Sequence, residues 1–214
     1  MKKKEMIELD IVSMHEDGFG LTADGTNAVY GSLPGESVVA APFARKRKML
    51  FSRVDSIAHP SEFRVEPRCS AAAYCGGCSY QHVAHDAQLR FKQEQLQETF
   101  EQCPPENWLA PLNGDSYHYR SKARLGVKFV DKKGRVLVGF REKKKPYIAE
   151  IDDCHVLREP VSKLLAPLSR LIEKLSIVRS VPQIEVAIGD AETALVFRHM
   201  EALSREDERL ITQF

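Results

Sequence analysis

The chain has 214 residues, of which 43% are hydrophobic, and its 31 lysines and arginines nearly balance 30 aspartates and glutamates. This length and apolar content suffice for one large or two small domains with a buried core. No stretch approaches the roughly 18 apolar residues that a membrane span needs, and acidic residues interrupt the basic N-terminus before it reaches signal-peptide length. The composition therefore excludes membrane and secreted classes and predicts a soluble cytoplasmic protein, in which thiols stay reduced.

Residues 6–58 have the pattern of a small β domain. Short apolar runs alternate there with turn-rich pieces such as "HEDGFG" and "LPGE". About five strands in about fifty residues suit a small closed barrel better than an open sheet, because closure removes exposed edges. We therefore predict an α+β protein with a β-barrel in residues 1–59 and a second, antiparallel-sheet domain in residues 60–214.

Three of the five cysteines lie within ten residues, in "CSAAAYCGGC". Two residues separate Cys75 from Cys78, a spacing that lets one loop present both sulfurs to a metal. Cys69 lies shortly before them, and Cys154, far downstream, completes a set of four thiolates. Zinc and an iron–sulfur cluster both accept such a set, and the lack of a second short cysteine pair favours the cluster. Buried thiols without a metal are the alternative.

The segment after these cysteines predicts a helix over residues 85–100, with Leu89, Leu96 and Phe100 on one face. The adjacent prolines after Cys103 end it, and an irregular linker follows. Cys103 has no cysteine or activating base near it in the sequence, so a spare thiol is a better interpretation than a nucleophile.

The most regular segment of the chain is "YHYRSKARLGVKF", residues 117–129. Its odd positions are mostly apolar and its even positions mostly basic, and a period of two places these sets on opposite faces of a strand. The basic residues are Arg120, Lys122, Arg124 and Lys128. We expect residues 135–141 and 147–151 to form the second and third strands of an antiparallel meander.

Two further helices and a hairpin complete the predicted elements. A leucine stripe in residues 159–175 predicts a helix that Pro167 kinks or divides. Residues 182–199 predict a hairpin, and residues 203–214 predict a helix with Ser204 as its N-cap. The apolar face of this last helix has little chain left to cover it, so we expect the whole protein to continue beyond it.

The basic strand lies in the most unevenly charged part of the chain. Residues 117–149 contain eleven lysines and arginines but only two acidic residues, Asp131 and Glu142, in a chain of net charge +1. Basic side chains bind the phosphates of RNA, whereas an ordinary solvated surface mixes the two signs. The segment therefore predicts an RNA contact, and a solvated sheet face is the alternative.

Several motifs together resemble the bacterial S-adenosylmethionine-dependent RNA uracil-5-methyltransferases, in the branch that modifies large-subunit ribosomal RNA and carries a [4Fe-4S] cluster. They are "CSAAAYCGGCSYQH", "QLRFKQEQL", "YRSKARLGV", "VGFRE" and "IDDCHVL". "MHEDGFGLT" with "GSLPGESV" is similar to the N-terminal TRAM domain of that family, an OB-like barrel that binds RNA. The resemblance implies that Cys69, Cys75, Cys78 and Cys154 are the four cluster ligands.

The resemblance also implies a part that these residues do not contain. Family members continue into a Rossmann-like domain that binds S-adenosylmethionine and supplies a nucleophilic cysteine and a glutamate base. No glycine-rich loop follows a strand here, and Cys103 does not match the context of that nucleophile. We therefore expect no catalytic residue in this chain, and we expect residues 86–116 to pack against the missing domain.

Three functions compete on these grounds. The first is the RNA-recognition half of a ribosomal RNA uracil-5-methyltransferase, which uses S-adenosylmethionine only through the missing domain and acts as a monomer on ribosomal RNA. The second is a stand-alone zinc- or iron–sulfur-binding RNA or ribosome-associated module. The third, an electron-transfer protein, is weaker because the chain has one cluster motif and no second redox site.

Overall fold

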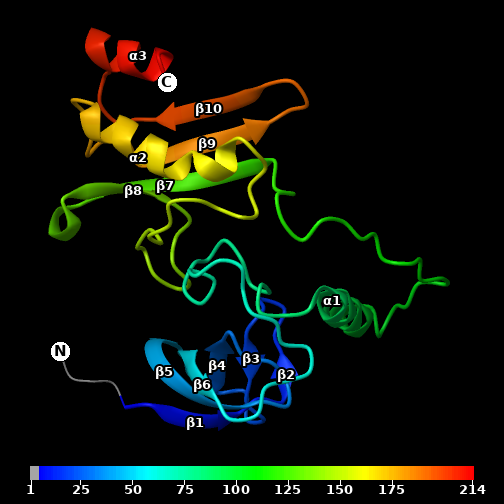
Figure 1. Cartoon of the computed structure of the whole chain (residues 1–214). Coiled ribbons are helices and arrows are strands. Elements are labelled where there is room, and N and C mark those ends of the chain that lie inside the picture. Colours follow the sequence, from blue (N-terminus) through cyan, green and yellow to red (C-terminus); the bar gives the residue numbers. More distant parts are fainter. Residues whose placement is uncertain (1–4) are drawn as a thin grey trace. The chain divides into compact units, whose positions relative to one another are not determined.

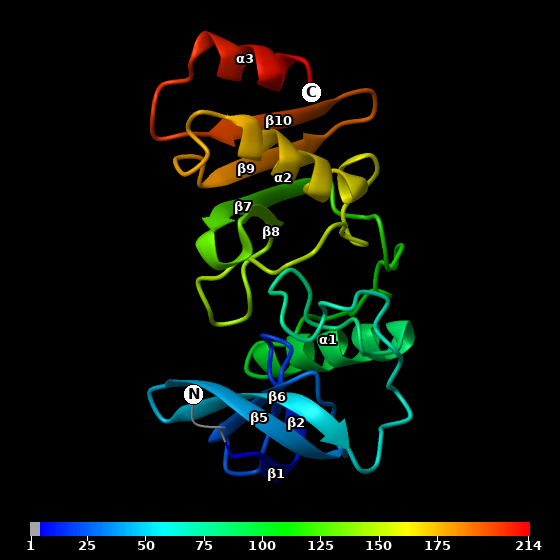
Figure 2. The same cartoon turned by 60° about the vertical axis from the view of Figure 1, so that its left-hand side comes forward.

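The computed structural model describes residues 5–214, and the basic residues before Glu5 lie outside them. Their contacts divide this part of the chain into two compact units. The first unit comprises residues 5–73 and 78–113, and the second comprises residues 74–77 and 114–214. Each unit combines a β-sheet with one or more helices, so the α+β class is confirmed (Figures 1 and 2).

The predicted division between residues 59 and 60 stays a prediction. Among residues 5–214, none of the helices combines the length and the apolar character required to cross a bilayer.

The first unit is built on one curled sheet of six strands in the order β1-β5-β6-β4-β3-β2 (Figure 1). The pairs are antiparallel except β4 with β6, which is parallel. The strands are β1 (Ile7–Asp10), β2 (Ser13–Met14), β3 (Gly20–Leu21), β4 (Asn27–Tyr30), β5 (Ser37–Lys46) and β6 (Met49–Ile57). The predicted β domain is therefore present, and its closure into a barrel stays a prediction.

The two faces of this sheet pack into different apolar clusters. Along β4, Val29 joins a cluster with Val38, whereas its neighbours Ala28 and Tyr30 join a cluster with Phe51. Successive side chains of a strand point to opposite faces, which is why one short strand serves both clusters. All five side chains are at least 95% buried.

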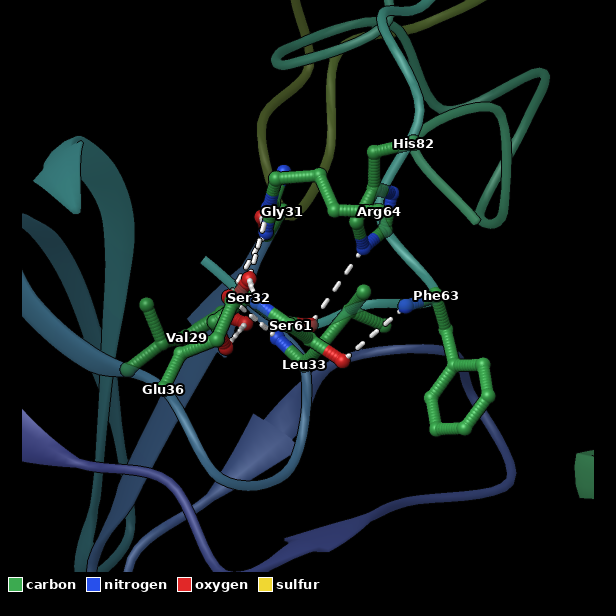
Figure 3. Close-up of polar contacts among 9 residues, drawn as sticks. All are labelled: Val29, Gly31, Ser32, Leu33, Glu36, Ser61, Phe63, Arg64 and His82. Carbon is green, nitrogen blue, oxygen red and sulfur yellow. Dashed lines mark hydrogen bonds and ion pairs between the residues drawn. The ribbon is translucent and has the colours of Figure 1, made fainter. Parts of the chain in front are cut away.

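A buried ion pair fastens the chain that follows β6 onto the sheet (Figure 3). The Glu36 side chain is fully buried, and its carboxylate accepts hydrogen bonds from Arg64 and from the backbone N–H groups of Leu33 and Ser61. The Arg64 guanidinium also donates to the carbonyl oxygen of Gly31, at 2.7 Å. Every oxygen of the buried carboxylate is thus paired, as burial of a charge requires.

Helix α1 (His85–Thr99) packs on this unit through a face that differs from the predicted one. Ala87 and Phe91 are buried against Leu33 and Val83, which lie in the loops before it. The predicted face is wrong, because Leu96 and Phe100 are each 44% exposed. Phe91 follows Ala87 by four positions, so the two lie on one stripe of the helix, and the sequence reading chose the stripe of Leu96 and Phe100 instead.

The second unit contains an antiparallel sheet in the order β10-β9-β7-β8, with helix α2 over one face (Figure 1). Leu165, Leu168 and Ile172 of α2 are buried, as are Leu125, Val136 and Ile184 of the sheet. The elements are β7 (Lys122–Val130), β8 (Arg135–Gly139), β9 (Gln183–Ile188), β10 (Thr193–Arg198), α2 (Leu165–Lys174), and the short 3₁₀ helices η1 (Asp131–Lys133) and η2 (Val161–Lys163).

The predicted meander is right in its first turn and wrong in its third strand. β7 and β8 pair as expected, but residues 147–151 form only one isolated bridge, between Ile148 and Arg141. The other side of β7 pairs instead with β9, from more than fifty residues downstream. The predicted hairpin of β9 and β10 is confirmed.

The helices of the second unit are close to the predicted ones. Pro167 neither kinks nor divides α2, because it lies in the first turn, where a backbone N–H has no partner within the helix. Helix α3 (Arg205–Thr212) begins after Ser204, as predicted. Ser204 and Asp207 form a reciprocal capping box, and Asp207 also accepts two hydrogen bonds from Ser176.

Candidate functional site

The cysteine loop runs alongside the end of β8 in the second unit. Cys75 forms an isolated β-bridge with Glu142, and the Gly76 N–H donates to the Arg141 carbonyl at 2.8 Å. The Lys143 N–H donates to the Tyr74 carbonyl at 2.9 Å. These backbone bonds hold Cys75, which is buried, at a defined place beside residues 141–143.

Two glycines give this loop the space to approach its neighbours closely. A Cβ on Gly76 would lie 2.7 Å from the Arg141 carbonyl oxygen, and a Cβ on Gly77 would lie 2.8 Å from the Phe140 ring. Real Cβ atoms essentially never come this close to other heavy atoms. The Gly77 N–H also points at the Cys75 sulfur, at 3.4 Å. The two glycines therefore let the loop pack directly against Arg141 and Phe140, with one backbone N–H, that of Gly77, next to sulfur.

Cys69 and Cys78 lie in the first unit and share one polar neighbour. The Gln81 side-chain oxygen accepts from the Cys69 N–H at 3.1 Å, and its side-chain N–H donates to the Cys78 sulfur at 3.3 Å. Both cysteines are half-buried.

Cys154 is buried in the second unit, after the β8 segment and before η2. Its N–H donates to the Ser162 carbonyl at 2.8 Å, and its carbonyl accepts from the Leu157 N–H at 3.2 Å. Cys103 is exposed beyond the end of α1. Two of the four predicted ligands thus lie in each unit, and the part of the chain that the structure describes holds no assembled group of three His, Cys, Asp or Glu side chains able to bind a metal.

Strand β7 has the predicted alternation along most of its length. Lys122, Arg124 and Lys128 are exposed, whereas Leu125 and Val127 between them are buried. Residues directly opposite in an antiparallel sheet share a face, and Arg124 lies opposite Glu185 of β9. The charged row is therefore on the face away from α2, and a carboxylate stands in the middle of it.

Arg120 lies outside this row. β7 begins at Lys122, and Arg120 is half-buried with its guanidinium 5.3 Å from the centre of the Phe140 ring. Its backbone pairs with residues 156–158 by bonds to Val156 and Arg158. The predicted strand was too long at its start, because the alternation of Tyr117 and Tyr119 with polar residues continued into a segment that pairs elsewhere.

Glu185 is the polar residue of this face that sequence reasoning missed. Its Oε1 accepts hydrogen bonds from Arg198 Nε and from Gln183 Nε2, each at 3.1 Å. The Arg198 hydrogen bond, together with the positive charges of Arg198 and Arg124, holds the pKa of Glu185 below its ordinary value. In the sequence, Glu185 is visible only as a single acidic residue in the apolar strand "QIEVAI". The pairing of β9 with β7 then places it opposite Arg124.

A second basic surface, at the tip of the β5–β6 hairpin, was also missed. Residues 45–48 are four consecutive arginines and lysines, and all four are exposed. Arg53 stacks over Phe43 in the same hairpin, 5.5 Å from the ring centre. The basic run between two apolar strands was visible in the sequence as a charged turn.

No protein-family model matches the chain. Curated relatives do, and three of them carry the name 23S rRNA (uracil(1939)-C(5))-methyltransferase RlmD. The relative from Nitrosococcus oceani is 45% identical over 217 residues, that from Alkalilimnicola ehrlichii 44% over 216, and that from Bordetella avium 42% over 213. The matches cover 98–99% of the chain and 45–48% of the relatives, so the chain spans about half the length of the curated relatives it matches.

A solved structure is also similar in fold. It is the tRNA (uracil-54, C5)-methyltransferase of Pyrococcus abyssi in complex with S-adenosyl-L-homocysteine, which superposes with a TM-score of 0.69 at 21% identity. The match covers 95% of this chain and 48% of that one. At this identity the likeness concerns the fold alone.

The fold is thus one found in an RNA uracil-C5-methyltransferase. The predicted resemblance is confirmed at the level of sequence. Nearly the whole chain is homologous to a stretch that makes up about half the length of each of these 23S rRNA (uracil-C5)-methyltransferases.

Proposed function

We propose that this chain is the RNA-recognition part of a ribosomal RNA uracil-C5-methyltransferase that works in the cytoplasm as a monomer. The observation that carries the proposal is the 42–45% identity, over nearly the whole chain, to enzymes named for methylating a uracil of 23S rRNA. Binding of S-adenosylmethionine and the chemical step then belong to residues outside this chain, and residues 86–116 pack against that missing part.

The exposed basic residues supply the RNA contact in this proposal. Lys122, Arg124 and Lys128 follow one strand with every second side chain on the same face, so they meet successive phosphates of a bound strand. Arg120 contributes from beside Phe140. Residues 1–59 form a TRAM-like, OB-like barrel in this proposal, and its basic hairpin tip adds further charge.

We also propose that Cys69, Cys75, Cys78 and Cys154 ligate a [4Fe-4S] cluster. The donor set fits such a group, because all four are thiols, two are buried, and Cys75 and Cys78 each receive an N–H···S hydrogen bond. Cys78 follows Cys75 by three residues, and consecutive Cα atoms are about 3.8 Å apart, so the Cα atoms of the two cysteines lie within about 11 Å of each other. In this proposal the four cysteines would hold the cluster, and their bonds to it would link the cysteine loop to Cys154.

Iron and sulfide analysis of protein purified without oxygen tests the cluster. The expected protein is brown, absorbs broadly near ~400 nm and contains iron and acid-labile sulfide. Gly76→Ala should lower the iron content, because the added methyl would lie 2.7 Å from the Arg141 carbonyl and push Cys75 out of place. Gly114→Ala, in open space, is the matched control and should load fully. Colourless protein with stoichiometric zinc would refute the iron–sulfur assignment in favour of a zinc module.

RNA binding and methyl transfer are measured separately. The chain should bind fragments of 23S rRNA with an affinity that falls as salt rises, since phosphate contacts release counterions. It should transfer no methyl group from labelled S-adenosylmethionine to the same RNA. Absence of binding at low salt would refute the recognition role, and methyl transfer by the chain alone would refute its dependence on further residues.

A further inference from the structure

The face of the second sheet that points away from α2 holds a groove with a carboxylate in it. This groove, of about 490 Å³, is lined by Lys122 and Arg124 of β7, Glu185 and Ala187 of β9, and Ala194 and Val196 of β10. Its volume falls in the range of small-molecule sites. The register explains its shape, because Arg124, Glu185 and Val196 form one row across the three strands and Lys122, Ala187 and Ala194 form the next.

The groove has a charged side on β7 and an apolar side toward β10. Ala187, Ala194 and Val196 are small and exposed, so they leave a shallow apolar floor at the open edge of the sheet. Lys122 and Arg124 stand on the other side, one residue in each row. A nucleotide has the same two-sided character, with a flat base and a charged phosphate.

The carboxylate of Glu185 is fixed in place and still has an unused acceptor. Arg198 and Gln183 both donate to its Oε1, and no described residue donates to Oε2. The side chain is 30% exposed, so Oε2 is available to a ligand. A carboxylate inside a phosphate-binding surface repels phosphate, so its presence in the groove calls for a ligand group that donates hydrogen bonds.

We propose that this groove reads one base of single-stranded RNA and selects a base with an exocyclic amino group. Adenine and cytosine each offer an amino donor next to an acceptor, which matches an ionised carboxylate beside an arginine, and guanine offers an amino donor next to its N1–H, which matches the carboxylate. Uracil instead presents a carbonyl oxygen on either side of its single N–H, and one of these oxygens must face the carboxylate. The groove is therefore a specificity site that discriminates against uracil.

This inference rests on the proposed RNA-binding function and adds a base preference to it. The bound base lies on the floor of Ala187, Ala194 and Val196, while Lys122 and Arg124 hold the neighbouring phosphate. Readout of an unstacked base by its Watson–Crick edge is the usual way in which proteins recognise single-stranded RNA.

Binding of short uridine oligonucleotides that differ at one central base tests the proposal with the full chain. The chain should bind RNAs with a central adenine, cytosine or guanine about fivefold or more tightly than the all-uridine RNA, as expected for one paired base edge. Glu185→Gln should abolish this ratio, because an amide offers the donor and acceptor that uracil requires. Ala194→Leu should also abolish it by filling the floor without changing charge.

Glu192→Gln is the matched control, since it removes the same charge from the turn of the same hairpin, outside the groove. It should raise the affinity for all four RNAs slightly and leave their ratio unchanged. Equal binding of all four RNAs by the unaltered chain, or a preference that survives Glu185→Gln, would overturn the base-reading site alone. Failure to bind any of the RNAs at low salt would overturn the proposed RNA-binding function as well.

Discussion

One ion pair of the first unit and one of the second differ in how far they are buried. In the first unit the Glu36 side chain is fully buried, the side chain of its partner Arg64 is 19% exposed, and each carboxylate oxygen has a donor (Figure 3). In the second unit, Arg198 and Glu185 lie with Arg124 on an open sheet face, where the side chains of the pair are 59% and 30% exposed. A charge that is buried with all its partners is committed to the fold, whereas a charge on an open face remains available to a ligand.

The largest effect on stability is expected at the buried pair. Glu36→Gln should lower the free energy of unfolding of the first unit by about 3–5 kcal/mol, because it leaves the Arg64 charge without its partner. Urea denaturation followed by tyrosine fluorescence and circular dichroism measures this change. A double replacement by apolar residues, Glu36→Leu with Arg64→Met, should restore only part of the loss, because the backbone N–H groups of Leu33 and Ser61 also lose their acceptor. If Glu36→Gln unfolds at the same urea concentration as the unaltered chain, the pair is not what fastens residues 58–64.

The open face should show the reverse, with a large loss of RNA affinity and little loss of stability. Reversing Lys122, Arg124 and Lys128 to Glu removes three phosphate contacts, so the affinity should fall by about tenfold or more and the salt slope should decrease by about two. Titration at several salt concentrations measures both quantities. The three side chains are exposed, so the urea midpoint should stay near that of the unaltered chain. An unchanged salt slope contradicts the phosphate-binding role.

Acid should affect the first unit through Glu36. Burial alone would raise the pKa of this carboxyl, but hydrogen bonds from Arg64, Ser61 and Leu33 hold it below its ordinary value of 4.5. A carboxyl whose pKa is lower in the folded state stabilises the fold above its unfolded pKa, and this contribution is lost as the pH falls through the folded value. Thermal unfolding of the chain should therefore become easier below about pH 4.5, and Glu36→Gln should weaken this dependence. Parallel pH profiles for the two proteins would contradict it.

The smallest effect is expected at an exposed pair of the second unit. Arg135→Ala removes the contacts of Arg135 with Asp152 and Glu150. All three side chains are more than one third exposed. Surface pairs of this kind contribute about 0–1 kcal/mol, because water screens them and ordering the side chains costs entropy. Urea denaturation should show a change within that range. A loss as large as that of Glu36→Gln would remove the distinction between the buried and the exposed ion pair.

The sequence predicted the local patterns well and the distant pairings poorly. The alternation of Arg124 and Lys128 with Leu125 and Val127 identified β7 and its exposed face, because a period of two needs no knowledge of neighbours. The carboxylate opposite Arg124 comes from β9, and no local pattern indicates which strand pairs with which. The prediction of a third meander strand was wrong for the same reason, and the role of Glu185 was missed for that reason too.

The cysteine site shows the same limit. The spacing of Cys75 and Cys78 and the two glycines between them predicted a loop that approaches other backbone closely, and Gly76 does contact Arg141. The role of Gln81, which bonds to both Cys69 and Cys78, was not visible, because a glutamine three residues after a cysteine has no pattern of its own. The cluster itself remains a proposal.

Ultraviolet cross-linking of the chain to 23S rRNA fragments, followed by mass spectrometry of the peptides, tests the central claim most directly. The account predicts RNA adducts on peptides that contain residues 122–128 and 183–198, which form the open face of the second sheet. Adducts confined to the basic hairpin tip at residues 45–48, or the absence of adducts from β7 and β9 while the RNA is bound, would contradict it.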